Sequence, residues 1–220
     1  TMLGIIIGVA AVISLMSVGK GLQQGVVNRI QSMGTNLLYV RPAAVQQGGG
    51  VGGGVGDSPR LTLEDAEAIK NAGNPSIVLI APERRSQFQV VSGSLNMRAQ
   101  VMGVTPDYMP ALNYQLKGGD FIDQQHLANR SLVAVIGANV AEKLFTGDDP
   151  VGQPVKINNK RFNVIGILES KGSTGMSFLD DIVFIPLTTM QSRLLSQRSG
   201  QNLTIQQISI QVSDNKLMNQ

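Results

Sequence analysis

Few residues in this chain could carry acid–base or nucleophilic chemistry. It has no cysteine, which excludes disulfides and thiolate metal sites within its 220 residues, and its one histidine, His126, stands beside two glutamines. No G-x-S-x-G or H-E-x-x-H motif occurs. Nucleophilic catalysis would therefore rest on His126 alone. We predict that His126 is a solvated loop residue and that the chain has no catalytic residue.

The acidic residues give no convincing cation site. Asp148–Asp149 and Asp180–Asp181 are adjacent pairs. Neighbouring residues on a strand point to opposite faces, and aspartates in turns hydrogen-bond the backbone, so we interpret both pairs as turn residues. Asp120 and Asp123 could approach a cation, but no further oxygen ligands follow at loop spacing. The sequence therefore predicts no metal site.

A glycine-rich stretch at 46–58 contains a formal dinucleotide-binding pattern. Gly48, Gly50 and Gly53 satisfy G-x-G-x-x-G. No helix opens on the last glycine, however, and the stretch has low complexity, so we interpret it as a flexible loop. Gly19-Lys20 lacks the earlier glycine and the following Ser or Thr of a phosphate loop. We predict no cofactor-binding residue in this chain.

The composition argues against a nucleic-acid partner. The net charge is +3 without a dense basic block, aromatics make up 4%, and Trp is absent. Such a chain lacks both a basic stripe and stacking platforms. Hydrophobic residues make up 42%, which suffices for a sizeable core.

The first residues predict a membrane helix. Residues 2–18 carry no charge, and the chain opens on Thr1, so the apolar run could begin upstream. A spanning helix needs about 20 apolar residues. A cleaved signal peptide is disfavoured because GKGLQQ follows the run, and a buried core helix because the run lacks a polar face. Gly4 and Gly8 form a G-x-x-x-G pair that could pack against another helix in lipid.

The predicted helix continues beyond the membrane as a stalk. Apolar residues recur at helical spacing with polar residues on the other face, and a glycine follows: Leu22, Val26, Ile30, Met33 and Gly34. One helix over 2–33 would be roughly 48 Å long. Such a rod could carry movement into a soluble domain. A simple anchor, or a rod broken at Gly19, Gly21 or Gly25, is the alternative.

The remaining residues predict an α+β domain. We expect first a strand, a helix, a short strand and a hairpin, at 36–41, 62–71, 77–81, and 87–91 with 97–104. A helix capped by Thr105, a turn at 118–120, a strand at 132–136 and a helix at 138–145 should follow. The last elements should be a hairpin of 155–158 and 161–168 turning at Asn159-Lys160, a strand at 181–185, a helix at 186–195 and a strand at 205–212.

The order of several segments resembles the MacB-type permeases of ABC transporters, whose relatives include LolC/LolE-like and FtsX-like proteins. These segments are LGIIIGVAAVISLMSVGKG, VVNRIQSMGTNLLYVRP, LTLEDAEAI, QVMGVTPDYMP, VAVIGANVAEKLFTGDDPVGQPVKINNKRFNVIGIL and DDIVFIPLTTMQSRL. The resemblance covers roughly residues 3–212.

The resemblance implies a four-helix permease of the bacterial inner membrane with a two-lobed domain on its periplasmic side. Residues 1–34 would be the membrane helix and stalk, 35–104 and 204–220 parts of a porter-like lobe, and 105–203 a smaller mixed lobe. It further implies a homodimer in membrane lipid, an ABC ATPase that binds Mg-ATP, fused or separate, and an adaptor protein in tripartite exporters. The family pattern carries no catalytic residues.

We therefore expect a non-enzymatic part of an export permease that works by mechanotransmission. One alternative is an FtsX-like regulator of an extracytoplasmic partner, although FtsX-type loops are usually much shorter. Another is a membrane-anchored binding or structural module without an ATPase. A hydrolase is disfavoured by the missing nucleophile–base set. Nothing in the sequence selects among the macrolides, peptides, lipoproteins and toxins that the family exports.

Overall fold

The computed structural model describes residues 16, 36–42, 61–171, 173–174, 177–195 and 204–213. The described residues from 36 onward belong to one compact unit. None of the described helices is long and apolar enough to cross a bilayer. The predicted membrane helix apart from Met16, and with it Gly4 and Gly8, lies outside the described residues, as do the whole predicted stalk and the glycine-rich loop at 46–58.

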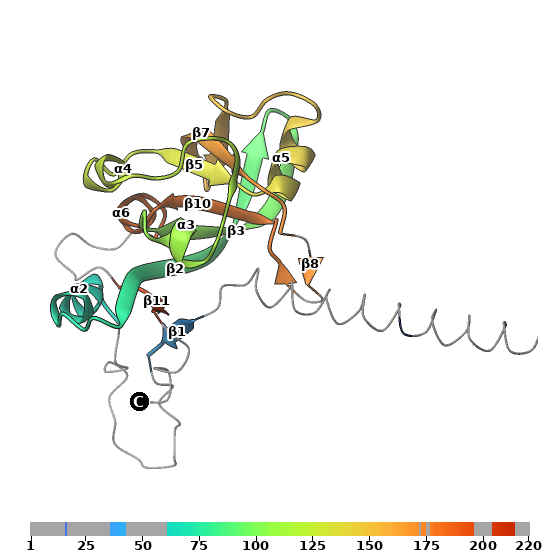
Figure 1. Cartoon of the computed structure of the whole chain (residues 1–220). Coiled ribbons are helices and arrows are strands. Elements are labelled where there is room, and N and C mark those ends of the chain that lie inside the picture. Colours follow the sequence, from blue (N-terminus) through green and yellow to red (C-terminus); the bar gives the residue numbers. More distant parts are fainter. Residues whose placement is uncertain are drawn as a thin grey trace, which may run out of the picture. The chain divides into compact units, whose positions relative to one another are not determined.

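Most of the strands form one mixed sheet (Figure 1). Its order is β1 (Leu37–Val40), β11 (Gln207–Val212), β2 (Ile77–Ser92), β3 (Leu95–Val104), β10 (Ile182–Pro186), β5 (Val133–Ile136), β7 (Lys160–Leu168) and β4 (Leu116–Gly119). The β3–β10 and β5–β7 pairs are parallel and the other pairs antiparallel. β8 (Ser173–Thr174) and β9 (Ser177–Phe178) form a separate hairpin.

β6 (Pro154–Ile157) turns part of this sheet into a closed ring, because it pairs with both β2 and β7. The ring runs from β2 through β3, β10, β5, β7 and β6 back to β2. β1 and β11 lie outside the ring and continue the sheet from the first half of β2. One strand, β2, therefore belongs to both parts of the domain.

The helices are short and lie against the sheet (Figure 1). They are α2 (Leu63–Asn71), α3 (Tyr108–Ala111), α4 (Gln124–Ala128), α5 (Ala138–Phe145) and α6 (Leu187–Thr189), which continues as the π-helical turn η1 (Met190–Leu194). Two predicted helices are confirmed, α2 and α5. α2 begins with a capping box in which Thr62 and Asp65 satisfy each other's backbone N–H groups.

Buried apolar side chains form three clusters, and the largest is lined by the ring and covered by α5. It includes Val90, Val101, Ile136, Val140, Phe162 and Ile185. A second cluster packs α3 against the other face of β3, β10 and β5, where Phe184 makes edge contacts with Tyr108 and Tyr114. A third packs α2 and α6 against β2 and β11. The described residues thus combine helices and strands, as predicted.

The predicted strand 77–81 was wrong in its length, since β2 has 16 residues and contains Pro82. Proline normally ends a strand because it lacks a backbone donor. Here β11 pairs with β2 up to Glu83, and β3 pairs with β2 from Glu83 onward. The exchange of partners at Glu83, next to Pro82, keeps the strand continuous.

Other local predictions also need correction. Thr105 does not cap α3 with its hydroxyl; its carbonyl accepts from Tyr108 N at 3.0 Å, and Asp107 holds the N-cap position. Residues 118–119 end strand β4 instead of forming a turn. The β6–β7 hairpin turns at Asn158 and Asn159, whose φ angles of 46° and 62° fit a type I′ turn.

Residues 186–195 do not form one α-helix, because α6 spans three residues before the wider turn of η1. The lobe boundaries at 104/105 and 203/204 stay a prediction. Within the described residues, strand pairs join segments on either side of the 104/105 boundary. β2 pairs with β6, and β3 pairs with β10.

Candidate functional site

The residues that could have carried chemistry serve local structure. His126 lies in α4 and not in a loop, so that prediction was wrong. Its Nδ1 accepts a hydrogen bond from Asp123 N at 3.2 Å, and Asp123 Oδ1 accepts from His126 N at 2.7 Å. This reciprocal pair caps the first turn of α4.

The acidic pairs also hold backbone and neighbouring side chains. Asp149 Oδ1 accepts from Val151 N at 3.0 Å, as the turn interpretation predicts. Asp180 accepts from Lys171 N at 2.9 Å, whereas Asp181 binds the side chain of Asn139. The two aspartates therefore face different partners. Across the described ranges, no group of three His, Asp or Glu side chains could hold a metal ion.

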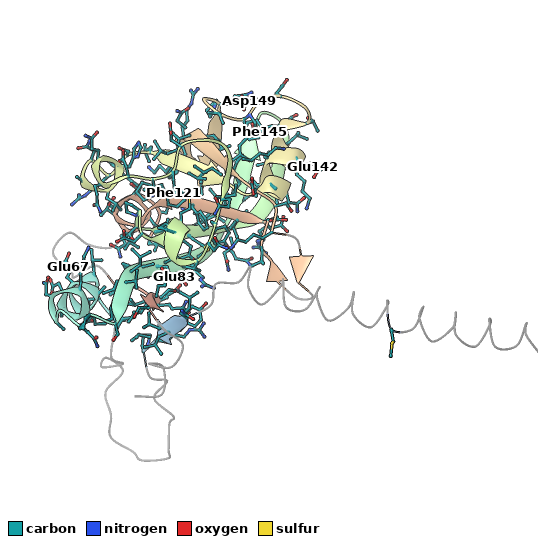
Figure 2. The ribbon with its side chains drawn as sticks, in the orientation of Figure 1. Glu67, Glu83, Phe121, Glu142, Phe145 and Asp149 are labelled. Atoms are coloured by element: carbon teal, nitrogen blue, oxygen red, sulfur yellow. The ribbon has the colours of Figure 1, made fainter. Side chains whose placement is uncertain are left out.

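A different residue, which the sequence analysis did not single out, occupies an unusual position. Glu83 has no solvent exposure, although it lies on β2 between Gln207 of β11 and Val104 of β3 (Figure 2). Arg85 lies two residues along the strand on the same face. Its Nε donates to Glu83 Oε1 at 2.6 Å, and its Nη2 pairs with the same oxygen. Glu83 Oε2 is buried without a hydrogen-bond partner among the described residues.

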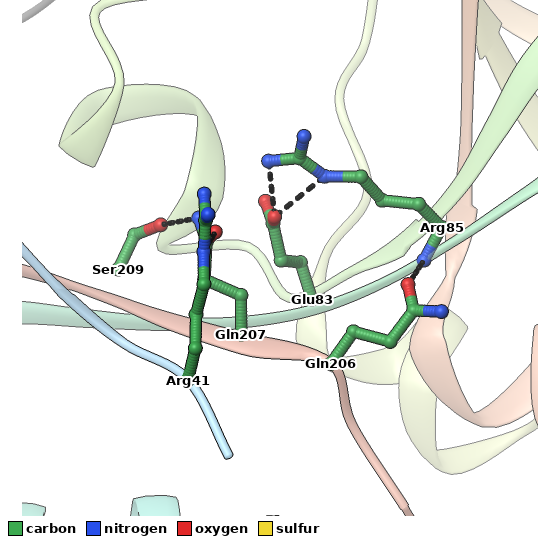
Figure 3. Close-up of polar contacts among 6 residues, drawn as sticks. All are labelled: Arg41, Glu83, Arg85, Gln206, Gln207 and Ser209. Atoms are coloured by element: carbon green, nitrogen blue, oxygen red, sulfur yellow. Dashed lines mark hydrogen bonds and ion pairs between the residues drawn. The ribbon is translucent and has the colours of Figure 1, made fainter. Parts of the chain in front are cut away.

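Three further contacts lie on or between the neighbouring strands, and one of them starts from Arg85 (Figure 3). Arg85 N donates to Gln206 Oε1 at 2.8 Å, which ties β2 to the start of β11. Arg41, directly after β1, donates from Nε to Gln207 Oε1 at 2.6 Å. Gln207 Nε2 donates in turn to Ser209 Oγ at 3.2 Å. We call Arg41, Glu83, Arg85, Gln206, Gln207 and Ser209 the Glu83 cluster.

The electrostatics of the Glu83 cluster favour a charged Glu83–Arg85 pair and keep the nearby side chains of Tyr39 and Tyr108 neutral. Burial is the largest single effect and lowers the pKa of Arg85, but the charge and hydrogen bond of Glu83, together with the fields of Tyr108 and Tyr114, outweigh it and raise that pKa. Burial, followed by the field of Glu83, raises the pKa of Tyr108 well above its ordinary value. The same two causes raise the pKa of Tyr39. The cluster pairs no nucleophile with a base, so its geometry suits a mechanical tie between strands.

The Glu83 cluster left a weak signal in the sequence. The run APERR places charges directly after an apolar strand, and residues two apart on a strand share a face. Their partners on β11 come about 120 positions later, however, as in the contact of Arg85 with Gln206. No local pattern identifies such a pairing.

Comparison with known proteins decides the family. A sequence model of the MacB-like periplasmic core domain matches residues 1–220. The chain belongs to this family. The resemblance to MacB-type permeases is thereby confirmed.

Sequence relatives agree with this assignment. The macrolide export ATP-binding/permease protein MacB of Rhodospirillum rubrum is 42% identical over 210 residues, which cover 93% of this chain and 31% of the relative. The protein of the same name from an Azoarcus species is 38% identical over 206 residues, with coverages of 93% and 30%. The chain therefore spans about a third of the length of these relatives.

Solved structures share the fold. The periplasmic region of MacB from Actinobacillus actinomycetemcomitans superposes with a TM-score of 0.64 at 21% identity and covers 84% of this chain and 78% of that one. The extracellular domain of the noncanonic ABC-type transporter YknZ from Gram-positive bacteria gives a TM-score of 0.63 at 16% identity, with coverages of 83% and 85%.

Proposed function

We propose that this chain is the periplasmic domain and first membrane helix of an ABC exporter permease in a bacterial inner membrane. The match of the family model to all 220 residues is the observation that carries the proposal. The relatives are named as ATP-binding and permease proteins, so ATP binding and permeation belong to a single chain in those proteins. An ABC ATPase, fused or separate, would therefore bind Mg-ATP and drive this chain.

The proposed mechanism is mechanotransmission through hydrogen-bonded strands. The predicted stalk leads along the chain directly into β1, which pairs with β11 over four residue pairs. β11 pairs with β2 from Ile77 to Glu83, and β2 continues into the ring. A pull on the stalk would thus load β1, β11 and β2 in turn.

The Glu83 cluster lies at the step of this path where β2 leaves β11 for β3. Its contacts join the end of β1 to β11, and β11 to β2. Strands pulled along their length slide more easily when only backbone hydrogen bonds hold them, since side-chain contacts add resistance. We propose that the cluster stiffens this path, so that movement of the stalk reaches the ring.

The assembly around this chain is proposed from the same family relation. Two copies would form a homodimer, with Gly4 and Gly8 in helix packing within the lipid. A periplasmic adaptor protein would dock on the domain if export is tripartite. Macrolide export is named for the relatives and supports an export role without fixing the substrate here.

The test is to tag the full-length protein, purify it from solubilised membranes, and identify its companions by mass spectrometry. We expect ATPase activity on the same chain or an ABC ATPase in the sample, and an adaptor in a tripartite exporter. A purified protein with no ATPase in either form would overturn the permease proposal. An anchored binding or structural module would then be the better account. A cell-wall hydrolase in place of an adaptor would favour an FtsX-like regulator.

A further inference from the structure

A cavity opens between α2 and α4, outside the Glu83 cluster, and Ile80 and Pro82 of β2 also line it. Its volume is about 410 Å³, within the range of small-molecule sites. α2 lines one side with Leu63, Ala66 and Glu67, and α4 lines the other with Leu127 and Ala128. A smaller cavity of about 260 Å³ shares three lining residues with it: Lys70, Ile80 and Asp107. The two cavities are therefore neighbours beside the first half of β2, and we call them together the trough.

The trough combines an apolar floor with polar side chains that make no side-chain hydrogen bond within the described part of the chain. Leu63, Ala66 and Leu127 line the larger cavity with apolar surface. Asp107 holds the N-cap position of α3, yet its carboxylate makes no capping hydrogen bond. The hydroxyl of Thr105, which also lines the cavity, is buried without a partner among the described residues.

The charges around the trough favour a cation. The titratable residues that line the two cavities are Glu67 on α2 (Figure 2), Lys70 and Asp107. Asp107 and Lys70 each line both cavities. Glu67 and Lys70 are exposed, whereas Asp107 is half-buried, so the Asp107 carboxylate is the charge least able to turn away into water. The Lys70 ammonium lies on an exposed residue at the end of α2 and can turn into water.

We propose that this trough binds a cationic amphiphile: a drug-sized molecule with an apolar body between α2 and α4 and an amine near Asp107. An apolar body alone would be held without orientation, whereas an amine beside a half-buried carboxylate gains a charge-assisted hydrogen bond. Binding is expected whether or not the full-length protein exports the molecule. The inference therefore goes beyond the proposed function, and either can fail without the other.

Cysteine protection in the full-length protein tests the site directly. This chain has no cysteine, so Ala128→Cys introduces a single thiol at the cavity once any cysteine elsewhere in the protein is replaced. Ala68→Cys is the matched control, because Ala68 is exposed on α2 and is not among the residues that line either cavity. Both variants are alkylated with N-ethylmaleimide in nanodiscs, with and without rhodamine 6G as the cationic amphiphilic probe. Sulforhodamine B serves as its anionic counterpart.

Rhodamine 6G should slow alkylation of Ala128→Cys several-fold and leave the Ala68→Cys rate unchanged, while sulforhodamine B should protect neither site. Adding Asp107→Asn should raise the rhodamine concentration needed for half-protection about tenfold, the loss expected for one charged contact. Thermal unfolding of Asp107→Asn, compared with the unmodified protein, checks that the domain remains folded. The absence of protection at Ala128→Cys, equal protection at both sites, equal protection by both dyes, or indifference to Asp107→Asn would each overturn the proposal.

Discussion

Arg85 Nε lies 2.6 Å from Glu83 Oε1, two residues along one strand, and Glu83 has no exposure to solvent. A carboxylate in the middle of a sheet is strongly disfavoured unless a countercharge and hydrogen bonds compensate its desolvation. The guanidinium supplies both for one oxygen, and the other oxygen has no partner among the described residues. Two apolar side chains in place of Glu83 and Arg85 would fill the same space at a smaller desolvation cost. Both residues lie on β2, so the ion pair bears on β11 through the neighbouring contact of Arg85 N with Gln206 Oε1.

Glu83→Gln should loosen the local pairing of β2 and β11. The variant keeps the shape of the side chain but leaves the Arg85 guanidinium without its countercharge. We expect the free energy of local opening to fall by about 2 kcal/mol, less than for a fully buried pair because Arg85 is partly solvated. Hydrogen exchange of the β11 amides measures this opening. The double variant Glu83→Leu/Arg85→Met should recover most of the loss; amide exchange in Glu83→Gln equal to the unmodified protein would contradict the assigned role.

Tyr114 should resist ionisation while the domain is folded. Burial raises its pKa to about 12, despite the opposing field of Arg85. The folded protein therefore keeps the phenolic proton between pH 10 and 12, where the unfolded chain loses it. The resulting stability is complete below pH 10 and is lost as the pH rises through 12. Ultraviolet difference titration of the protein against Tyr114→Phe should show this step near pH 12, and a step near pH 10 would refute the buried packing of this ring.

Lys171 should make stability depend on pH in a different window. Burial lowers the pKa of Lys171 to about 8, and its Nζ lies 3.9 Å from the centre of the Tyr114 ring. The folded state therefore binds the proton less tightly than the unfolded chain, so stability is lost as the pH falls from 10.5 through 8. As the pH rises from 8 to 10.5, the free energy of unfolding of the protein should increase relative to that of Lys171→Met. The increase should be on the order of 1 kcal/mol after allowance for solvent screening. Hydrogen exchange of the β10 amides at several pH values measures the difference; a flat difference would exclude the burial effect.

Gly119 should tolerate no side chain, whereas its neighbour Gly118 should. Gly119 has a φ of +77°, and a Cβ there would collide with the carbonyl of Ile165 on β7. At Gly118 a Cβ would meet no atom within 4 Å. Gly119→Ala should destabilise the β4–β7 pairing by about 2 kcal/mol or more, and Gly118→Ala should change it little. Thermal unfolding compares the two variants, and equal midpoints would show that β4 is not held as described.

The sequence predicted those elements whose signals are local. The capping box of Thr62 and Asp65 located α2, and the apolar spacing of residues 138–145 located α5. The ring could not be predicted, because the pairing of Val90 with Ile157 joins residues distant in the chain. The predicted strand 77–81 missed the continuation of β2 through Pro82, because β2 exchanges its partner β11 for β3 at Glu83 and no local pattern reports this exchange. The Glu83 cluster and the trough could not be predicted for the same reason, because their residues are far apart in the sequence.

If ATP binding and hydrolysis in the full-length protein move this domain, as proposed above, the separation of the two protomers in the proposed homodimer must change with nucleotide. A spin label at Ala68→Cys, exposed on α2, reports the separation of the two protomers by double electron–electron resonance in nanodiscs. The account predicts one distance distribution without nucleotide and a clearly different one with Mg-ATP and vanadate, with the difference reduced in Glu83→Gln. Identical distributions in both states, in a protein that hydrolyses ATP, would contradict it.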